Sequence, residues 1–443
     1  MKDTFDLQNP WRSPGYTFPD EPYIKRSIFS TLIEDLHKKK ITVLLGARQV
    51  GKTFLIKKMI EKLLADKEVD PKQIFYFNFD AFSLIDLVEN DRDFFNFIKS
   101  YGVTAKRTYI FLDEAQRIPE AGLLIKRYYD LGHDIKFIVS GSSSLQIKGQ
   151  TKETLTGRKT LFELYPVSYY EFLKFKGVEP PDSPAQALKF EAGGYQRLME
   201  EFVRFGGYPG VVVADSFEDK IILLKEIYNS YIQKDISDFL KVEDVSGFNR
   251  MVQFISAQTA SLCKINEVAK NVRLSRHFVE KYLLALEETY VIAFLRPYFA
   301  NLGKAIIKTP KLYFYDTGLR NAVFGEFQPL DNRADIGAMI ENFVFSELIK
   351  SVEKDRLWFY RTTSGSEIDF IFVKGNKIIP IEVKYRISGQ KAYPKTFNTL
   401  AKHTNFKKGL VITKDFLQEK KTLDMQILYI PASVLYCTGA ELD

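Results

Sequence analysis

One stretch of eight residues, GARQVGKT, constrains the fold of this chain more than any other feature. It runs from Gly46 to Thr53, between the apolar run ITVLL and the helix-like segment FLIKKMIEKLL. A strand, a glycine-rich turn and a helix in this order place backbone N–H groups and a helix N-terminus around a phosphate. The sequence therefore predicts a phosphate-binding loop. The alternative is a glycine turn that merely joins a strand to a helix.

The loop residue types also predict individual roles. In this geometry Lys52 reaches the β and γ oxygens of a triphosphate, and the Thr53 hydroxyl ligates Mg²⁺. We expect ATP to contact the whole loop and the residue after it, that is, Gly46, Ala47, Arg48, Gln49, Val50, Gly51, Lys52, Thr53 and Phe54.

A second acidic site follows in TYIFLDEAQ, which ends at Gln116. Its apolar residues predict a buried strand that leads directly into two acids. Asp113 would hold the water shell of Mg²⁺ opposite Thr53, and Glu114 would polarise the attacking water. Acids after apolar runs are common at strand ends, so the assignment depends on the phosphate-binding loop that precedes it.

A further apolar strand, within DIKFIVSGSSSLQI, ends in hydroxyl side chains. In ATPases with one strand inserted between the loop strand and the acidic strand, the inserted strand carries a polar sensor of the γ-phosphate. Ser140 and Ser142 are the candidates. A serine-rich loop is also an ordinary way to leave a strand.

Together these motifs resemble a large family of prokaryotic AAA-type ATPases that carry a C-terminal domain known as DUF4143. The resemblance rests on GARQVGKT, FLDEAQ and SGSSS, followed in the family's order by GRKTLFELYPVSYYEF, FGGYPG, YIQKDI, YFYDTGL and IEVKY. It runs from about Tyr23 to about Ile412. The resemblance implies an ATPase core, a helical lid, a winged helix and a nuclease-like C-terminal domain.

The expected fold class is accordingly α/β, with a parallel AAA-type core because strands and helices alternate. We place an N-terminal arm and helix at residues 1–36, the core at 37–167, the lid at 168–245, the winged helix-turn-helix at 246–310 and a PD-(D/E)xK-like α/β domain at 311–443. The arm up to Pro22 is rich in proline and aromatic residues. We expect it to be extended and able to fasten onto another domain.

An arginine often completes the active site of AAA-type enzymes by stabilising charge on the γ-phosphate, from a neighbouring subunit or from the lid. Arg158 matches the family's GR pair and is the first candidate, with Arg48 and Arg204 behind it. The alternative for Arg158 is a surface arginine beside the start of a strand.

The order of predicted elements from Leu262 to Tyr298 is typical of a winged helix-turn-helix, with Ser275 as the N-cap of its second helix. In DNA-binding versions that helix enters the major groove, and Arg276, His277 and Lys281 would face the duplex. Nearby glutamates dilute the charge. A packing or partner module is the alternative.

A second chemical constellation lies in SEIDFIFVKGNKIIPIEVKYR, where Gly375-Asn376 predicts a two-residue hairpin turn. If Lys374 pairs with Lys377, Asp369 lies opposite Glu382. Strict alternation then places Glu367, Asp369, Glu382 and Lys384 on one face, and Ile368, Phe370, Phe372, Ile379, Ile381 and Val383 on the other.

Two carboxylates about 5 Å apart repel unless a cation lies between them, and we expect a divalent metal ion there. The pattern is similar to the nuclease fold named for its PD-(D/E)xK motif, in which the acids bind Mg²⁺ and the lysine orients or activates water. By this resemblance Glu341, on an apolar helix, completes the metal site with Asp369 and Glu382. The alternative is a solvated hairpin face on which Lys384 pairs with Glu367.

The composition fits several globular domains, with 45% hydrophobic and 27% charged residues in 443. Two cysteines, Cys263 and Cys437, give no disulfide framework, so we expect a reducing cytoplasm. We see no signal peptide and no apolar run of about eighteen residues, and expect no membrane insertion. A net charge of +7 is compatible with nucleic acid.

The sequence thus predicts a protein that binds and hydrolyses ATP with Mg²⁺ and couples the nucleotide state to a metal-dependent, nuclease-like module. The expected partners are nucleic acid, with DNA favoured, and a second copy of the chain. The alternative function is a nucleotide-dependent switch or scaffold whose C-terminal domain binds protein or nucleic acid without cleaving it.

Overall fold

The computed structural model describes most of the chain, and its described residues are 2–20, 23–65, 69–101, 107–142, 155, 157–181, 183, 186, 192–230, 244–298, 308–362, 365–385, 394–401, 404, 406–421 and 425–438. The YIQKDI motif lies outside them. The chain forms two compact units: residues 1–165 with 288–290, and residues 166–287 with 291–443. Within the described ranges, no helix combines the length and the apolar character needed to span a bilayer.

The first unit is built on a five-stranded parallel sheet in the order β2-β3-β4-β1-β5. The strands are β1 (Ile41–Leu45), β2 (Ile74–Asn78), β3 (Thr108–Asp113), β4 (Ile135–Gly141) and β5 (Lys159–Glu163). Every residue of β1 and β3 is buried, which explains their uninterrupted apolar runs. The predicted α/β core is confirmed, and β4 is the strand inserted between the loop strand and the acidic strand.

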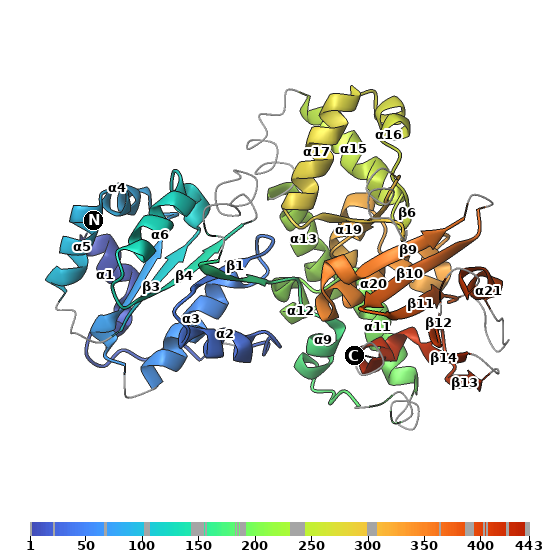
Figure 1. The fold of residues 1–443 in the computed structure, drawn as a ribbon, viewed down its shortest axis with the longest axis horizontal. Helices are drawn as coiled ribbons and strands as arrows, with labels where there is room; N and C mark the ends of the chain where they lie inside the picture. The colour runs from blue at the N-terminus through green and yellow to red at the C-terminus, as the bar shows by residue number, and fades with distance from the viewer. Residues whose placement is uncertain are drawn as a thin grey trace. The chain divides into compact units, whose positions relative to one another are not determined.

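Helices cover both faces of this sheet (Figure 1). They are α2 (Phe29–Leu36), α3 (Lys52–Ala65), α4 (Ile85–Glu89), α5 (Asp91–Ser100) and α6 (Ala121–Asp130). The chain passes from β1 across the sheet to β2 through α3, then returns towards β4 through α4, α5 and α6. Right-handed crossovers in opposite directions put α3 on one face and the later helices on the other.

The N-terminal arm is not extended, as the sequence suggested, over its first residues. It forms α1 (Lys2–Gln8) and the short 3₁₀ helix η1 (Pro10–Arg12). Phe5 is fully buried against the rings of Phe75, Phe77 and Tyr101. Burial of this aromatic side chain, which needs a helical turn to face the core, explains the difference.

Two amide side chains fasten the arm to the free edge of β2. Asn9 donates to the carbonyl of Tyr76 and accepts from its N–H, both at 2.8 Å. Gln8 makes the same pair of contacts with Asn78, at 3.1 and 2.9 Å. These side chains satisfy an edge that would otherwise expose unpaired backbone groups. The arm is therefore part of the core that it precedes.

Helices make up much of the second unit. They are α9 (Tyr169–Phe175), α11 (Ala192–Phe205), α12 (Pro209–Val213), α13 (Phe217–Ile227), α15 (Val245–Ala257), α16 (Ile265–Val272), α17 (Arg276–Glu288), α19 (Thr317–Phe324), α20 (Ile336–Ser351) and α21 (Lys395–Ala401). Further 3₁₀ turns in the chain are η2 (Pro71–Gln73), η3 (Phe82–Leu84), η4 (Ala115–Arg117), η6 (Leu330–Asn332), η7 (Lys354–Arg356) and η8 (Ala432–Thr438).

The helices expected to form a lid share the core of the second unit. The turn after α11 lies against Asp316 at the start of α19, whose carboxylate accepts from the Gly207 N–H at 2.7 Å. A Cβ at Gly206 would lie 2.1 Å from the same carboxylate, so the close approach requires glycine there. The segment is thus built together with the C-terminal half of the chain.

A small antiparallel sheet follows in the order β6-β8-β7. Its strands are β6 (Ser261–Leu262), β7 (Ile292–Leu295) and β8 (Lys311–Phe314). Ser275 accepts from the N–H of Phe278 at 3.3 Å, so it caps α17 as expected. β8 is the central strand, and a domain boundary after residue 310 would cut this sheet.

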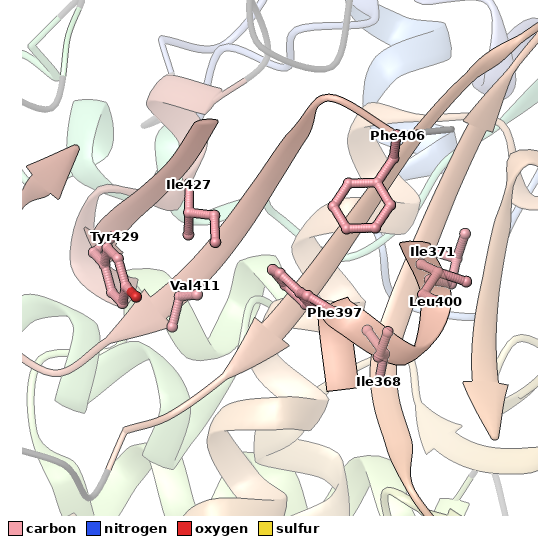
Figure 2. Close-up of a cluster of buried hydrophobic side chains, with 8 residues drawn as sticks. All are labelled: Ile368, Ile371, Phe397, Leu400, Phe406, Val411, Ile427 and Tyr429. Atoms are coloured by element: carbon pink, nitrogen blue, oxygen red, sulfur yellow. The ribbon is translucent and has the colours of Figure 1, made fainter. Parts of the chain in front are cut away.

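The C-terminal sheet has six strands in the order β13-β14-β12-β11-β10-β9. They are β9 (Leu357–Arg361), β10 (Glu367–Lys374), β11 (Lys377–Val383), β12 (Lys408–Thr413), β13 (Gln418–Lys421) and β14 (Gln426–Pro431). β11, β12 and β14 are parallel, whereas β9, β10 and β11 form antiparallel pairs. The mixed sheet packs α21 on one side through a cluster of buried apolar residues (Figure 2).

The predicted division of the hairpin into two faces is wrong at one point. Ile368 and Ile371 join the same apolar cluster with Phe397 (Figure 2), whereas Phe370 packs against Tyr313 and Phe345. The pairing of β10 with β9 shifts by one residue between Ile368 and Ile371. This β-bulge breaks the period of two, so strict alternation fails beside Asp369.

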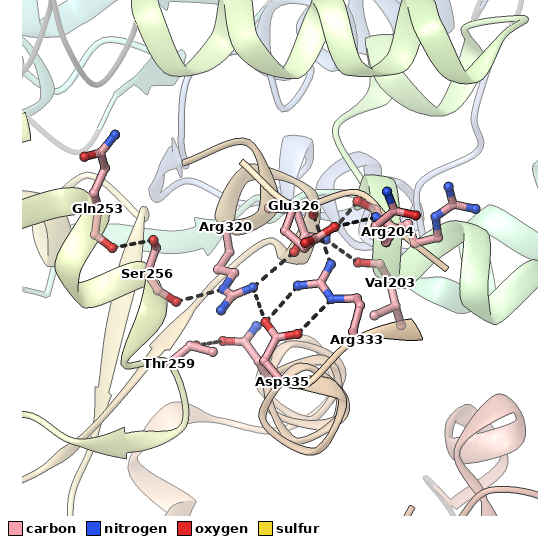
Figure 3. Close-up of polar contacts among 12 residues, drawn as sticks. Val203, Arg204, Gln253, Ser256, Thr259, Arg320, Glu326, Arg333 and Asp335 are labelled. Atoms are coloured by element: carbon pink, nitrogen blue, oxygen red, sulfur yellow. Dashed lines mark hydrogen bonds and ion pairs between the residues drawn. The ribbon is translucent and has the colours of Figure 1, made fainter. Parts of the chain in front are cut away.

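A buried polar network stabilises the helical part of the second unit. Figure 3 shows Arg320 and Arg333 directed at Asp335, with contacts of 2.6 and 2.8 Å. Arg320 is 1% exposed and also donates to the carbonyl of Ser256 on α15 at 2.8 Å. The two guanidinium groups and the shared carboxylate thus join α15 and α19 to the start of α20.

Candidate functional site

The predicted phosphate-binding loop joins the end of β1 to the start of α3. Gln49 and Gly51 have positive φ angles of 62° and 97°, which curl the loop into the conformation that turns N–H groups inward. Lys52 is 4% exposed, and its ammonium donates to the carbonyls of Gly46 and Ala47 at 3.1 and 2.8 Å. Burial lowers the pKa of Lys52, and the nearby acids oppose that shift.

Two contacts that sequence reasoning missed brace this loop. A Cβ at Gly46 would lie 2.2 Å from the carbonyl oxygen of Leu164, so the residue directly after β5 packs too closely for a side chain at position 46. Arg26 donates to the carbonyl of Val50 at 3.1 Å and to that of Tyr165 at 2.6 Å. The sequence signal was an arginine ahead of the first strand, but its burial is visible only in the structure.

Asp113, at the end of β3, is the centre of a hydrogen-bond cluster. Its Oδ2 accepts from the Thr53 hydroxyl at 2.7 Å and from the Tyr76 hydroxyl at 2.9 Å. Its Oδ1 accepts from the Ser140 hydroxyl and, at 3.1 Å, from the N–H of Glu114. The structure therefore brings together predicted residues from the loop helix, the acidic strand and the inserted strand.

Glu114 adopts a left-handed conformation, with φ 55° and ψ 38°. This is costly for a residue with a side chain and is typical of functional sites. Its carboxylate accepts from the side-chain amide of Gln116. The strained backbone turns the chain out of the sheet directly after Asp113.

A cavity of about 660 Å³ opens at this edge of the sheet. Its wall includes Lys52, Thr53, Phe54 and Glu114 on the core side and Trp11 on the N-terminal side. Such a volume suits a nucleotide-sized ligand. Thr53 and Asp113 fit the oxygen ligands that Mg²⁺ takes, directly or through water.

The remaining predicted residues of the first unit lie around this centre or away from it. Ser142 is buried just beyond the end of β4, and Arg48 is half-buried in the loop. Arg158 lies beside the start of β1, because its carbonyl accepts from the Ile41 N–H at 2.9 Å. The five residues of β1, about 16 Å of strand, separate it from the loop.

The side chains of Arg158 and Arg204 both contact other groups of the protein. The Arg158 guanidinium pairs with Asp130 at 2.8 Å. Arg204, in the second unit, donates to the carbonyl of Phe327 at 3.0 Å. The placement of Arg158 at the far end of β1 does not bring it to the phosphate loop of its own chain.

In the second unit, the hairpin has the predicted register. Lys374 pairs with Lys377, and the ladder continues to Phe370 with Ile381, so Asp369 and Glu382 are the next residues of the two strands. Asp369 Oδ2 accepts from the N–H of Val383 at 2.8 Å. Lys384 pairs with Glu382 and not with Glu367.

Glu341 enters this region from α20 and lies beside β8. It accepts from Lys311 at 2.5 Å and from the Tyr313 hydroxyl at 2.7 Å. Lys311 also lies 2.8 Å from Glu367, which pairs on its other side with Arg361 at 2.7 Å. Sequence reasoning missed Lys311, since no local pattern distinguishes it from a surface lysine before a strand.

Burial dominates the electrostatics of this acid cluster. Burial, and then the nearby Asp369 carboxylate, raise the pKa of Glu341 and of Glu382 to about 7 against the opposing effect of Lys311 and Lys384. Burial also raises the pKa of Asp369. For Lys311, burial would lower the pKa, but Glu341, Asp369 and Glu367 outweigh it and raise it.

The cluster can be tested for its fit to a metal ion. Among the described residues, no group of three or more His, Cys, Asp or Glu side chains is arranged to hold one. Yet Glu382 is 4% exposed, and its Oε2 has no hydrogen-bond partner in the described part of the chain. A buried carboxylate oxygen without a partner needs a cation, a proton or water.

The predicted nucleic-acid residues lie on α17. Arg276, His277 and Lys281 are all exposed there. The guanidinium of Arg276 pairs with Glu280 at 2.8 Å, so the glutamate offsets part of the positive charge as the sequence indicated. Their role in binding stays a prediction.

Three protein-family models match parts of this chain. A family model described as an AAA domain matches residues 38–173, and a domain of unknown function, DUF4143, matches residues 336–433. A further domain of unknown function, DUF8612, matches residues 196–330.

Two relatives match nearly the full length of the chain. An uncharacterized protein of Haemophilus influenzae is 26% identical over 400 residues, which cover 88% of this chain and 93% of that protein. An uncharacterized protein of Methanocaldococcus jannaschii is 29% identical over 399 residues, with 87% and 85% covered.

Solved structures are more distant. The ORC1 protein of Aeropyrum pernix in complex with DNA is 12% identical with a TM-score of 0.31, and the match covers 72% of this chain and 96% of that one. The Cdc6 protein of Pyrobaculum aerophilum is also 12% identical with a TM-score of 0.31. The match covers 76% of this chain and 97% of that one.

The family matches confirm the resemblance that the sequence motifs indicated, in the same order along the chain. The chain thus combines a match to an AAA domain with a C-terminal match to DUF4143, the domain combination of the family that its sequence motifs resemble.

Proposed function

We propose that the first unit binds Mg²⁺ and ATP and hydrolyses the nucleotide. The observation that supports this most is the convergence of Thr53, Ser140 and Glu114 on the Asp113 carboxylate beside Lys52. Phosphoryl transfer requires little covalent chemistry from a protein, so positioned charges and donors at this edge of the sheet are what the reaction needs.

In this proposal each residue has a separate task. Lys52 exchanges its two loop carbonyls for phosphate oxygens, and the N–H groups of the loop hold the same phosphates. Thr53 and Asp113 hold Mg²⁺, which neutralises negative charge on the β and γ phosphates. Glu114 accepts a proton from the attacking water or orients it, and Ser140 senses the γ-phosphate.

The test is phosphate release with Mg²⁺ and ATP, together with nucleotide binding. Lys52→Ala should weaken ATP binding because it removes the charge that meets the phosphates. Glu114→Gln should bind ATP normally but hydrolyse it at least about tenfold more slowly, because it removes only the group that acts on water. Equal losses of affinity in both variants would contradict these roles.

For the second unit we propose a metal-dependent, nuclease-like site whose state depends on the nucleotide. Asp369 and Glu382 would ligate the divalent cation, and the Oε2 of Glu382 without a partner supports an additional ligand there. Lys384, paired with Glu382, would orient the attacking water. DNA is the favoured substrate, with Arg276, His277 and Lys281 as contacts on a winged helix.

The alternative is a nucleotide-dependent switch or scaffold that binds protein or nucleic acid and cleaves nothing. It is favoured by Lys311, which already neutralises part of the acid cluster. A nicking assay on single-stranded and duplex DNA and on RNA, with Mn²⁺ or Mg²⁺ and with or without ATP, separates the two functions. Cleavage that Lys384→Ala abolishes supports the nuclease, and cleavage that survives it indicates a contaminant.

Assembly and location complete the proposal. Arg158 lies at the far end of β1 from the loop of its own chain, which supports a homo-oligomer in which it meets the γ-phosphate of a neighbour. Cys263 and Cys437 form no disulfide, which supports a reducing cytoplasm as the compartment.

A further inference from the structure

A buried lysine occupies the acid cluster of the second unit. The ammonium of Lys311 lies 2.5 Å from Glu341, 2.8 Å from Glu367 and 3.8 Å from Asp369. Its side chain is 2% exposed, so water contributes little to its solvation. The three carboxylates therefore supply almost all the negative charge that balances it.

This arrangement joins three elements of the fold. Lys311 begins β8, Glu341 lies on α20, and Glu367 and Asp369 belong to β10. The ammonium lies 5.9 Å from the ring centres of Tyr313 and of Phe359, which leaves an apolar surrounding. Isolated burial of an ammonium group is strongly unfavourable, so its pairing with several acids is a built feature and not a chance surface contact.

The charges divide the cluster into two parts. The Oε1 of Glu341 accepts from both Lys311 and Tyr313, so this carboxylate is already paired with donors of the chain. Glu367 lies between Lys311 and Arg361. Glu382 pairs with Lys384, also through Oε1, but unlike Glu341 it has a buried Oε2 that lacks a partner among the described residues. The buried carboxylate oxygen that still lacks a cation or donor is therefore on Glu382 and not on Glu341.

We propose that Lys311 is a built-in counter-ion that replaces a divalent cation on the Glu341 side of the cluster and confines any divalent cation to Asp369 and Glu382. Glu341 then positions Lys311 and does not ligate metal, in contrast to the role expected from the family resemblance. The part of this inference that concerns Asp369 and Glu382 rests on the proposed metal site, whereas the replacement at Glu341 does not.

The experiment measures Mn²⁺ binding and thermal unfolding of the full chain in the Asp113→Asn background, without nucleotide, so that the first unit lacks its proposed metal-binding carboxylate and contributes little metal binding. Lys311→Met removes the ammonium but keeps an unbranched side chain. We expect it to lower the melting temperature in EDTA, because Glu341 and Glu367 lose their shared cation. Added Mn²⁺ should raise the melting temperature of Lys311→Met again, and the affinity of this variant for Mn²⁺ should exceed that of the parent by about tenfold or more.

Lys350→Met is the matched control. Lys350 is 8% exposed in its side chain and pairs at 2.8 Å with Glu347 on the same helix as Glu341. It should lower the melting temperature without a gain in Mn²⁺ affinity. A Lys311→Met variant that loses stability and gains no affinity, as this control does, would overturn the inference.

Two further variants keep the question decidable if Lys311→Met does not fold. Glu341→Gln should leave the Mn²⁺ affinity within about twofold of the parent, and Glu382→Gln should abolish Mn²⁺ binding. Loss of binding in Glu341→Gln would overturn the inference. If the parent shows no Mn²⁺ binding that depends on Glu382, the proposed metal site fails. A gain in Lys311→Met would still establish the replacement at Glu341.

Discussion

The hydroxyl of Tyr76 donates, at 2.9 Å, to the same carboxylate oxygen of Asp113 that accepts from Thr53 at 2.7 Å. Tyr76 lies on the edge strand β2, and its backbone is held by Asn9 of the N-terminal arm. Burial, and then the Asp113 carboxylate, raise the pKa of Tyr76, so it remains a donor at all ordinary pH values. The arm is thereby linked to the acid that would hold Mg²⁺.

Tyr76→Phe should slow ATP hydrolysis by about five- to tenfold while ATP affinity stays within about twofold, because the substitution frees Asp113 without touching the phosphate loop. Stability should fall by about 1 kcal/mol. Steady-state phosphate release and nucleotide titration measure the two effects. Tyr101→Phe is the control, because the Tyr101 hydroxyl donates to Asp6 and not to Asp113. It should leave the rate of hydrolysis and the ATP affinity unchanged. An equal loss of affinity in Tyr76→Phe would show that Tyr76 shapes the loop instead.

Asn9→Ala should release the arm. The side chain donates to the carbonyls of Phe5 and Tyr76 and accepts from the Tyr76 N–H, so its loss removes the partner of two backbone groups of Tyr76. We expect a loss of about 2 kcal/mol and faster proteolysis within the first twenty residues. Asn90→Ala, which removes the cap of α5, is the control. It should cost about 1 kcal/mol without exposing the arm, and equal cleavage in both variants would count against the anchoring role.

Arg158→Ala should lower the ATPase rate by about tenfold or more and leave ATP affinity nearly intact, if its guanidinium meets the γ-phosphate of a neighbouring subunit. Mixed with Glu114→Gln, it should recover partial activity, because an intact site can form between one copy of each. Asp130→Ala removes the partner of Arg158 within its own chain and should leave the affinity unchanged. If the mixture recovers no activity, Arg158 does not act on the γ-phosphate of a neighbouring subunit.

The raised pKa values of the acid cluster give a pH dependence. Glu382 has a pKa of about 7 in the folded chain, above the ordinary value, so the folded state binds its proton more tightly than the unfolded state. The resulting stability is present below about pH 4.5 and is lost as the pH rises to about 7. In EDTA, the difference in unfolding free energy between the parent and Glu382→Gln should grow by roughly 2–3 kcal/mol across this window. Denaturant titrations at several pH values measure it, and a constant difference would exclude the shift.

Local sequence determined the parts of this protein that depend on neighbouring residues. The loop GARQVGKT needs a strand before it and a helix after it, and the lengths of the apolar runs supply both. The buried run that ends in Asp113 and the run that ends at Gly141 likewise indicate strands of a parallel sheet. The Gly375-Asn376 turn fixed the hairpin register, because a two-residue turn leaves little choice of pairing.

Tertiary structure alone decided which distant groups meet. The arm packs on β2 because Phe5 finds an aromatic pocket and two amides match the free strand edge, and neither partner is visible in the arm itself. The bulge in β10 broke an alternation that the sequence pattern presented as regular.

Lys311 is the clearest case. Its sequence neighbours suggest an ordinary charged residue before a strand, yet packing of β8 against α20 and β10 excludes water and leaves three acids as its surroundings. The energy of a buried charge depends on every group around it, and these groups come from separate parts of the chain. Sequence patterns report local periodicity and turn chemistry, so they could indicate the acids of this site but not the cation that the fold places among them.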